Sequence, residues 1–114
     1  MNENTPLPFD ETLRETVQGV GIPVCEPKLY EGKALEYCVY TYTAVPVGHA
    51  DNTASGYRLL VSLHWYLPTR RRPSKRWALC RAIIDMGGTP PTVEDASDGD
   101  GQHYVFEFEY LEGF

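Results

Sequence analysis

The sequence predicts an α+β domain in which two helices pack on one face of a mainly antiparallel sheet of four to five strands. Two segments carry apolar residues at helical spacing and are followed by glycines. Longer segments of alternating apolar and polar residues occur in pairs, which is typical of antiparallel strands. The chain shows no internal repeat, linker or second domain, so residues 1–114 are expected to form a single domain.

The composition is that of a protein with a packed core. Of the 114 residues, 42% are apolar and 12% are aromatic, which excludes an intrinsically disordered chain. The formal net charge of −6 argues against a protein whose whole surface binds nucleic acid. No basic region precedes an apolar run at the N-terminus, and no stretch reaches the roughly 18 apolar residues of a membrane helix. We therefore expect a soluble protein that is made in the cytosol and has no membrane partner.

The first helix is predicted over residues 10–19. Asp10 can cap its N-terminus, and Leu13 and Val17 recur at helical spacing before the glycines that end the segment. Residues 1–9 contain two prolines and few apolar side chains, and we expect them to form a flexible N-terminal tail.

Two strands are predicted after this helix. Residues 22–25 form a short apolar run, and residues 35–45 are rich in β-branched and aromatic residues. On the longer strand, Cys38, Tyr40 and Tyr42 share one face.

The segment 57–67 alternates most regularly and is predicted to be the central strand. Its odd-numbered residues form one apolar face, while Arg58, Ser62 and His64 lie on the other. A polar loop over residues 46–56 precedes it, and loops of this length often carry function. The loop and its two strands are expected to form a long hairpin with a projecting tip.

A second helix is expected to begin after Ser74, which can cap it, and to end at the glycine pair 87–88. Six apolar residues form a wide stripe on this helix: Trp77, Leu79, Cys80, Ile83, Ile84 and Met86. An edge strand over residues 92–96, a turn over 97–101 and a last strand over 102–112 complete the domain.

The cysteines do not form a recognisable site. Cys25, Cys38 and Cys80 are an odd number without a CxxC pair, which argues against both a disulfide framework and a zinc site. We interpret them as small buried residues in a reducing compartment.

The turn near the C-terminus comes close to a calcium-binding loop. Asp98, Asp100 and Glu109 would occupy the first, third and twelfth positions of such a loop. The sixth position requires glycine and holds His103, so we interpret the segment as a hairpin turn.

The three histidines, His49, His64 and His103, stand in three different segments without ligand spacing. His64 is interpreted as an interface or half-exposed residue of its strand. No nucleophile, metal-ligand set or cofactor loop stands out, so we expect a protein that is not an enzyme and needs no cofactor.

Charge is segregated along the chain. Six of the ten basic residues fall within twelve positions: Arg70, Arg71, Arg72, Lys75, Arg76 and Arg81. Seven of the sixteen acidic residues fall within the last twenty-one: Glu94, Asp95, Asp98, Asp100, Glu107, Glu109 and Glu112. This layout suits copies that meet basic to acidic around a closed ring. Two alternatives stay open, in which the charges are solvated or the arginines face DNA phosphates.

Candidate contact residues come from the basic run, the polar loop and the acidic turn. They are Arg70, Arg71, Arg72, Lys75, Arg76, His49, Asp51, Asn52, Asp98 and Asp100.

The layout of the chain has a counterpart among known families. An aromatic strand reads YCVYTYT, and a second strand runs into a proline break, YRLLVSLHWYLPT. One amphipathic helix ends at glycine, RWALCRAIIDMGG, and the terminal pair reads EDASDGDGQHYVFEFEYLE. From about residue 10 onward this layout resembles the small tail-terminator or tail-completion proteins of long-tailed bacteriophages and prophages, a family without an invariant catalytic motif.

The resemblance implies a structural role. Such proteins cap the tail tube as a ring, usually six-fold, and offer a surface for joining the filled head. The implied partners are copies of the chain, the tail tube protein and neck or head-closure proteins, and the implied locations are the host cytoplasm during assembly and the virion tail or neck. The loop 46–56 would contact the tube or a neighbour, and the basic run 70–76 would form a subunit contact or line the DNA passage.

The main alternative is a stand-alone α+β module of the ferredoxin-like type that binds a ligand or regulates a partner. That interpretation predicts a monomer or dimer with a ligand-sized pocket. A head-closure protein is a third interpretation, which shares the structural class and differs in its partner.

Overall fold

The computed structural model describes residues 8–48, 55–99 and 101–113. Its elements are α1 (Pro8–Gly19), β1 (Cys25–Pro27), β2 (Tyr37–Val47), β3 (Gly56–Leu67), α2 (Arg76–Asp85), β4 (Thr92–Asp95) and β5 (Gln102–Gly113). Within these residues the strands form one sheet in the order β1-β2-β3-β5-β4. The β1–β2 pair is parallel and the other pairs are antiparallel, which confirms the predicted α+β fold.

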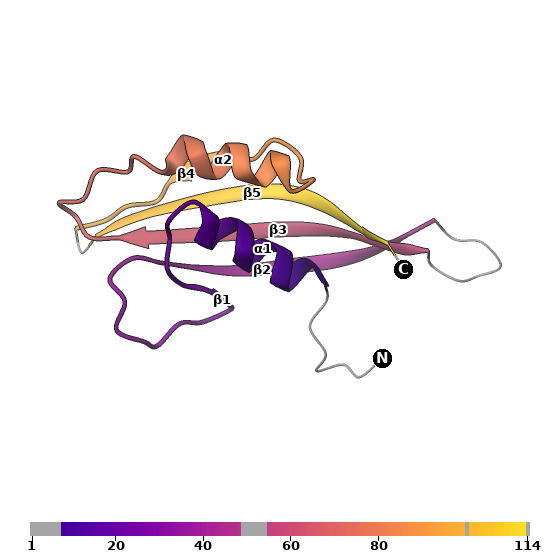
Figure 1. The fold of residues 1–114 in the computed structure, drawn as a ribbon, viewed down its shortest axis with the longest axis horizontal. Coiled ribbons are helices and arrows are strands. Elements are labelled where there is room, and N and C mark those ends of the chain that lie inside the picture. The colour runs from indigo at the N-terminus through magenta and orange to yellow at the C-terminus, as the bar shows by residue number, and fades with distance from the viewer. Residues whose placement is uncertain (1–7, 49–54, 100, 114) are drawn as a thin grey trace.

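The strand β3 lies at the centre of the sheet. It pairs with β5 from Gly56 to Leu67 and with β2 from Gly56 to Tyr66. The three long strands therefore run side by side along the molecule, which measures 54 by 27 by 24 Å (Figure 1). The predicted long β2–β3 hairpin is confirmed up to Val47 and Gly56.

Both helices contribute to one hydrophobic core on one face of the sheet. The buried helix residues are Phe9, Leu13 and Val17 of α1 and Leu79 and Ile83 of α2. They pack in one cluster with alternate strand residues, namely Cys38, Tyr40, Leu59, Val61, Leu63, Trp65, Leu67, Tyr104, Phe106 and Phe108. Even positions of β2 and β5 and odd positions of β3 thus face the helices, as the alternation predicts. The even positions of β3 form the opposite face, which we call the open face.

The helix α1 begins earlier than expected. It starts at Pro8, and Phe9 is fully buried, so the prediction of a flexible tail through residue 9 is wrong at these two residues. The Phe9 ring packs against Tyr42 and Tyr110, with centroids 5.7 and 5.0 Å away, and its backbone N–H donates to Glu112 Oε1 at 2.7 Å. Proline is well suited to a first helical turn, so Pro8 allows the helix to begin here. The contacts of Phe9 then hold this first turn against the sheet.

The N-terminal strands are shifted from their predicted positions. Ile22 is fully buried in the core, and the short strand β1 begins only at Cys25. The strand β2 begins at Tyr37, since Leu35 lies in the preceding loop and is 74% exposed. It continues to Val47 because β3 offers a partner at every position up to Gly56.

The helix α2 differs from its prediction in both its start and its apolar face. Lys75 occupies the N-cap without a side-chain capping hydrogen bond, so the expected Ser74 cap is wrong. Trp77 and Ile84 are 66% and 41% exposed, so the helix contacts the sheet along a narrower line than the predicted stripe. The expected stop is confirmed, since Gly87 has a φ of 110°, which favours glycine.

We expect Gly88→Ala to destabilise the fold by about 1–3 kcal/mol through overpacking. A Cβ at this position would lie 2.8 Å from Ile83 Cγ2 and 3.0 Å from Phe108 Cδ2. Gly19→Ala is the matched control, because nothing lies within 4 Å of the Cβ it would add. Urea unfolding measures both variants, and an unchanged stability of Gly88→Ala would contradict this packing.

Candidate interaction surface

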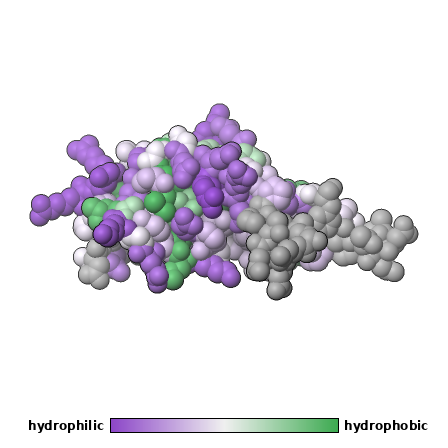
Figure 2. All heavy atoms as spheres, turned by 60° about the horizontal axis from the view of Figure 1, so that its bottom comes forward, coloured by the Kyte–Doolittle hydropathy of each residue, from purple (hydrophilic) through white to green (hydrophobic). Residues whose placement is uncertain are grey.

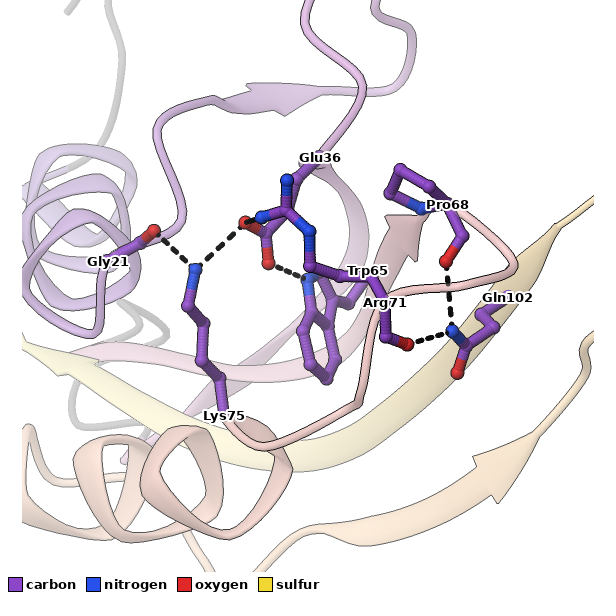
Figure 3. Close-up of polar contacts among 7 residues, drawn as sticks. All are labelled: Gly21, Glu36, Trp65, Pro68, Arg71, Lys75 and Gln102. Atoms are coloured by element: carbon purple, nitrogen blue, oxygen red, sulfur yellow. Dashed lines mark hydrogen bonds and ion pairs between the residues drawn. The ribbon is translucent and has the colours of Figure 1, made fainter.

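A buried carboxylate holds the basic segment to the sheet (Figure 3). Glu36 is 7% exposed and accepts hydrogen bonds from Trp65 Nε1 at 3.1 Å and from Lys75 Nζ at 2.8 Å. An Arg71 guanidinium nitrogen lies 3.8 Å from the same carboxylate, and Lys75 also donates to the Gly21 carbonyl at 2.7 Å. A buried charge is costly unless it is paired, so these contacts fix the loop between β3 and α2.

A second set of contacts joins this loop to β5. The side-chain amide of Gln102 donates to the carbonyls of Pro68, at 2.9 Å, and of Arg71 (Figure 3). It also lies 3.2 Å from the Thr69 carbonyl. The basic segment and the turn before β5 therefore lie at the same end of the sheet.

The structure divides the predicted basic contact residues into two groups. Arg71 and Lys75 are engaged with Glu36 inside the molecule. Arg70 and Arg72 are exposed and form no ion pair with any residue that the structure describes.

Arg76 belongs to the engaged group. Its guanidinium lies over the rings of Trp77 and Tyr104, 4.8 and 5.5 Å from their centroids. Its Nε is buried and has no hydrogen-bond partner within the described part of the chain. The cation–π contacts hold this side chain against α2 and β5.

The acidic turn lies beside the basic segment. Asp98 is exposed, and its backbone N–H donates to the Gly101 carbonyl at 3.2 Å in an isolated bridge. Both charged segments therefore lie at the same end of the molecule, near the turn before β5. The other predicted contact residues, His49, Asp51, Asn52 and Asp100, lie outside the described residues.

Sequence reasoning missed a row of neighbouring rings on the open face and the loop beside it. We call this set, Tyr30, Tyr37, Tyr66, His103 and His64, the aromatic–histidine row. Consecutive centroids lie 4.9, 5.0, 4.2 and 5.0 Å apart. The close stacking of Tyr37, Tyr66 and His103 occupies the ring faces that a base-stacking platform would have to expose.

Two histidines of this row share a hydrogen bond. His64 Nδ1 and His103 Nε2 lie 2.7 Å apart, and Ser62 Oγ lies 3.2 Å from His64 Nε2. Such a bond needs one ring nitrogen as donor and the other as acceptor, so at least one ring is neutral. Burial, followed by the charge of His64, lowers the pKa of His103, while the charge of Asp98 acts in the opposite direction.

A cavity of about 480 Å³ opens beside this row at the end of the sheet. Its lining combines rings, apolar side chains and polar groups: Leu35, Tyr37, Tyr66, Leu67, Pro68, Thr69, Asp98, Gly101, Gln102 and His103. The alternation of the strands already places Tyr37, Tyr66 and His103 on the face opposite the core. Only the register, which sets Tyr37 beside Tyr66 and Tyr66 beside His103, brings the rings together.

The surroundings of the three cysteine thiols disfavour the thiolate form. Burial raises the pKa of Cys25 to about 12 and also raises the pKa values of Cys38 and Cys80. A thiol attacks as thiolate, so these three groups are poor nucleophiles at neutral pH.

Two edges of the sheet lie open in the half away from this cavity. The strand β1 pairs with β2 only from Cys38 to Tyr40, so no described strand pairs with the outer side of residues 41–47. The strand β4 pairs with β5 only as far as Glu107, which leaves the outer side of residues 108–113 without a strand. Figure 1 shows β2, β3 and β5 extending here beyond both helices.

Exposed apolar side chains do not gather into one large patch. They come from four different segments, namely the loop before β2 (Leu29 and Leu35), β3 (Leu60), α2 (Trp77 and Ile84) and β5 (Leu111). In the view of Figure 2, green apolar atoms occur in separate groups among purple polar ones. The described surface therefore mixes polar and apolar side chains and shows no large apolar patch that would mark a docking site.

Within residues 8–48, 55–99 and 101–113, no three His, Cys, Asp or Glu side chains are placed to hold a metal ion. No helix of the described chain is long and apolar enough to cross a membrane. No protein-family model matches the chain, and no curated protein shows significant similarity to it.

We expect Glu36→Gln to lower the free energy of unfolding by about 1–3 kcal/mol, because it leaves Lys75 and Arg71 without their carboxylate. Glu31→Gln is the matched control on an exposed side chain. Equal stability of the two variants in denaturant titrations would show that Glu36 does not fix the loop.

The histidine pair predicts a pH dependence of stability. The pKa of His103 is lowered from its ordinary value of 6.5, so below that pH the unfolded chain binds more protons than the folded one. The contribution of neutral His103 to the free energy of unfolding is therefore complete above pH 6.5. It is lost as the pH falls from there through the lowered pKa of the folded state. Between about pH 7.5 and pH 5.5, wild type should lose more unfolding free energy than His103→Gln. Parallel pH profiles of the two proteins would contradict this assignment.

Proposed function

We propose that the protein is a structural component of a bacteriophage or prophage tail, not an enzyme. It assembles as a ring, with six copies as the expected number, caps the tail tube and contributes to joining the head. Its partners are copies of itself, the tail tube protein and neck or head-closure proteins. It acts in the host cytoplasm during assembly and in the tail or neck of the virion. The resemblance in chain layout supports this proposal, and so does the α+β fold.

The observation that carries the proposal is the pair of open sheet edges. A subunit of a cyclic ring has to present two different surfaces, each complementary to the other. The outer sides of β2 and β5 are on opposite sides of the three long strands and in the same half of the sheet. Neighbouring copies can therefore meet edge to edge without changing direction.

The exposed cations fit the same role. Arg70 and Arg72 are free to contact a neighbouring subunit or the phosphates of DNA that passes through the ring, whereas Arg71 and Lys75 maintain the fold. The basic segment thus has an anchored part and an outward-facing part.

A second candidate function rests on the cavity beside the aromatic–histidine row. Its volume of about 480 Å³ lies in the range of small-molecule sites. In this case the protein is a monomeric or dimeric ligand-binding module. A ligand that raises the unfolding temperature of wild type but not of Tyr66→Ala would favour it.

Light scattering behind size exclusion, across protein concentration, tests the two candidates. We expect a concentration-dependent ring, with six-fold particles in negative-stain images. A strict monomer at every concentration would contradict the ring and favour the ligand-binding module.

Arg70→Glu combined with Arg72→Glu should leave the fold intact, because neither side chain is engaged in an ion pair within the described residues.

A further inference from the structure

We infer that the open edge of β2 in one copy pairs with the open edge of β5 in the next copy, so that the sheet continues across the subunit contact. This inference rests on the proposed ring and names the residues that form its interface.

The outward-facing backbone groups of β2 follow from its existing bonds. The Cys38 N–H donates to the Val24 carbonyl at 2.8 Å, and the Tyr40 carbonyl accepts from the Lys28 N–H at 2.9 Å. Even-numbered residues therefore direct their backbone groups away from β3. Beyond β1 the next even positions are Tyr42 and Ala44, whose N–H and C=O groups no described strand pairs.

The strand β5 presents its odd-numbered residues outward. The Glu109 N–H donates to Thr89 Oγ1 at 2.8 Å, and the Glu109 carbonyl accepts from the Thr89 N–H at 2.9 Å. Glu109 is thus already bonded on its outer side. The alternation leaves Leu111 and Gly113 as the outward-facing residues that follow it.

The topology fixes the direction of the new pair. Both β2 and β5 run antiparallel to β3, so they are parallel to each other. Copies related by rotation about an axis close to the strand direction keep this direction. The contact between them is therefore a parallel pair, with an evenly spaced ladder of slanted hydrogen bonds.

The available groups match in such a ladder. The Leu111 N–H of one copy donates to the Tyr42 carbonyl of the next, and the Ala44 N–H donates back to the Leu111 carbonyl. The Gly113 N–H donates to the Ala44 carbonyl. Even positions of both strands lie on the helix-covered face, so the two faces of the sheet also continue without a break.

The chemistry of the β2 edge supports a strand as its partner. Residues 41–47 carry no charged side chain, although 23% of the chain is charged. Soluble proteins usually protect open edges with charges, bulges or covering segments. An uncharged edge that is rich in β-branched residues is suited to burial against another strand.

Two proline substitutions test the pairing. Ala44→Pro removes an N–H that points away from β3 and blocks the β2 edge, and Leu111→Pro does the same on β5. Each should raise the protein concentration needed for half-assembly by about tenfold or more in light scattering. Ala44→Thr and Leu111→Thr, which keep the N–H, are the matched controls and should assemble like wild type. Circular dichroism and the unfolding temperature check that each variant folds.

Mixing the two proline variants separates this pairing from other contacts. Each variant keeps one intact edge, so an equimolar mixture should form no particle larger than a dimer. Dimers formed by Leu111→Pro alone would indicate β2–β2 pairing about a two-fold axis and overturn the inference. Rings formed by both proline variants would place the contact elsewhere while leaving the proposed function standing. A wild type that never assembles would contradict the proposed function itself.

Discussion

The structure depends on the uninterrupted pairing of β3 with a strand on each side. Its backbone groups are bonded to β2 and β5 over nearly its whole length, which forces a strict alternation of its side chains. The odd positions, from Leu59 to Leu67, are buried beneath the helices, and the even positions form the open face. A slip by one residue would move Trp65 to the open face and Arg58 into the core, so the pattern of one strand fixes the register of the sheet.

The two ends of the sheet have different characters. At one end, Glu36 and Gln102 tie the loop after β3 to the body, and the rings of Tyr37, Tyr66 and His103 stack above a cavity. At the other end, three strands extend past the helices with open edges. Side chains therefore organise the first end, whereas the second offers mainly backbone groups.

The sequence predicts well what depends on local periodicity. The helix-covered face of β3 follows from alternation alone, and the end of α2 follows from Gly87. It predicts poorly what depends on distant partners. Phe9 lies in the helix and packs against rings of β2 and β5. Of the predicted apolar stripe of α2, only Leu79 and Ile83 are buried. The Glu36 contacts and the histidine pair join residues 29 to 39 positions apart, so no spacing rule finds them without the register.

Pro46 gives the open β2 edge a further property. It stands at an even position, where its missing N–H would face an added strand, and it interrupts the uncharged segment 41–47 after five residues. Stacked fibrils grow from segments of six or seven residues without proline. The edge is therefore long enough to form a short, specific ladder and too short to template indefinite growth.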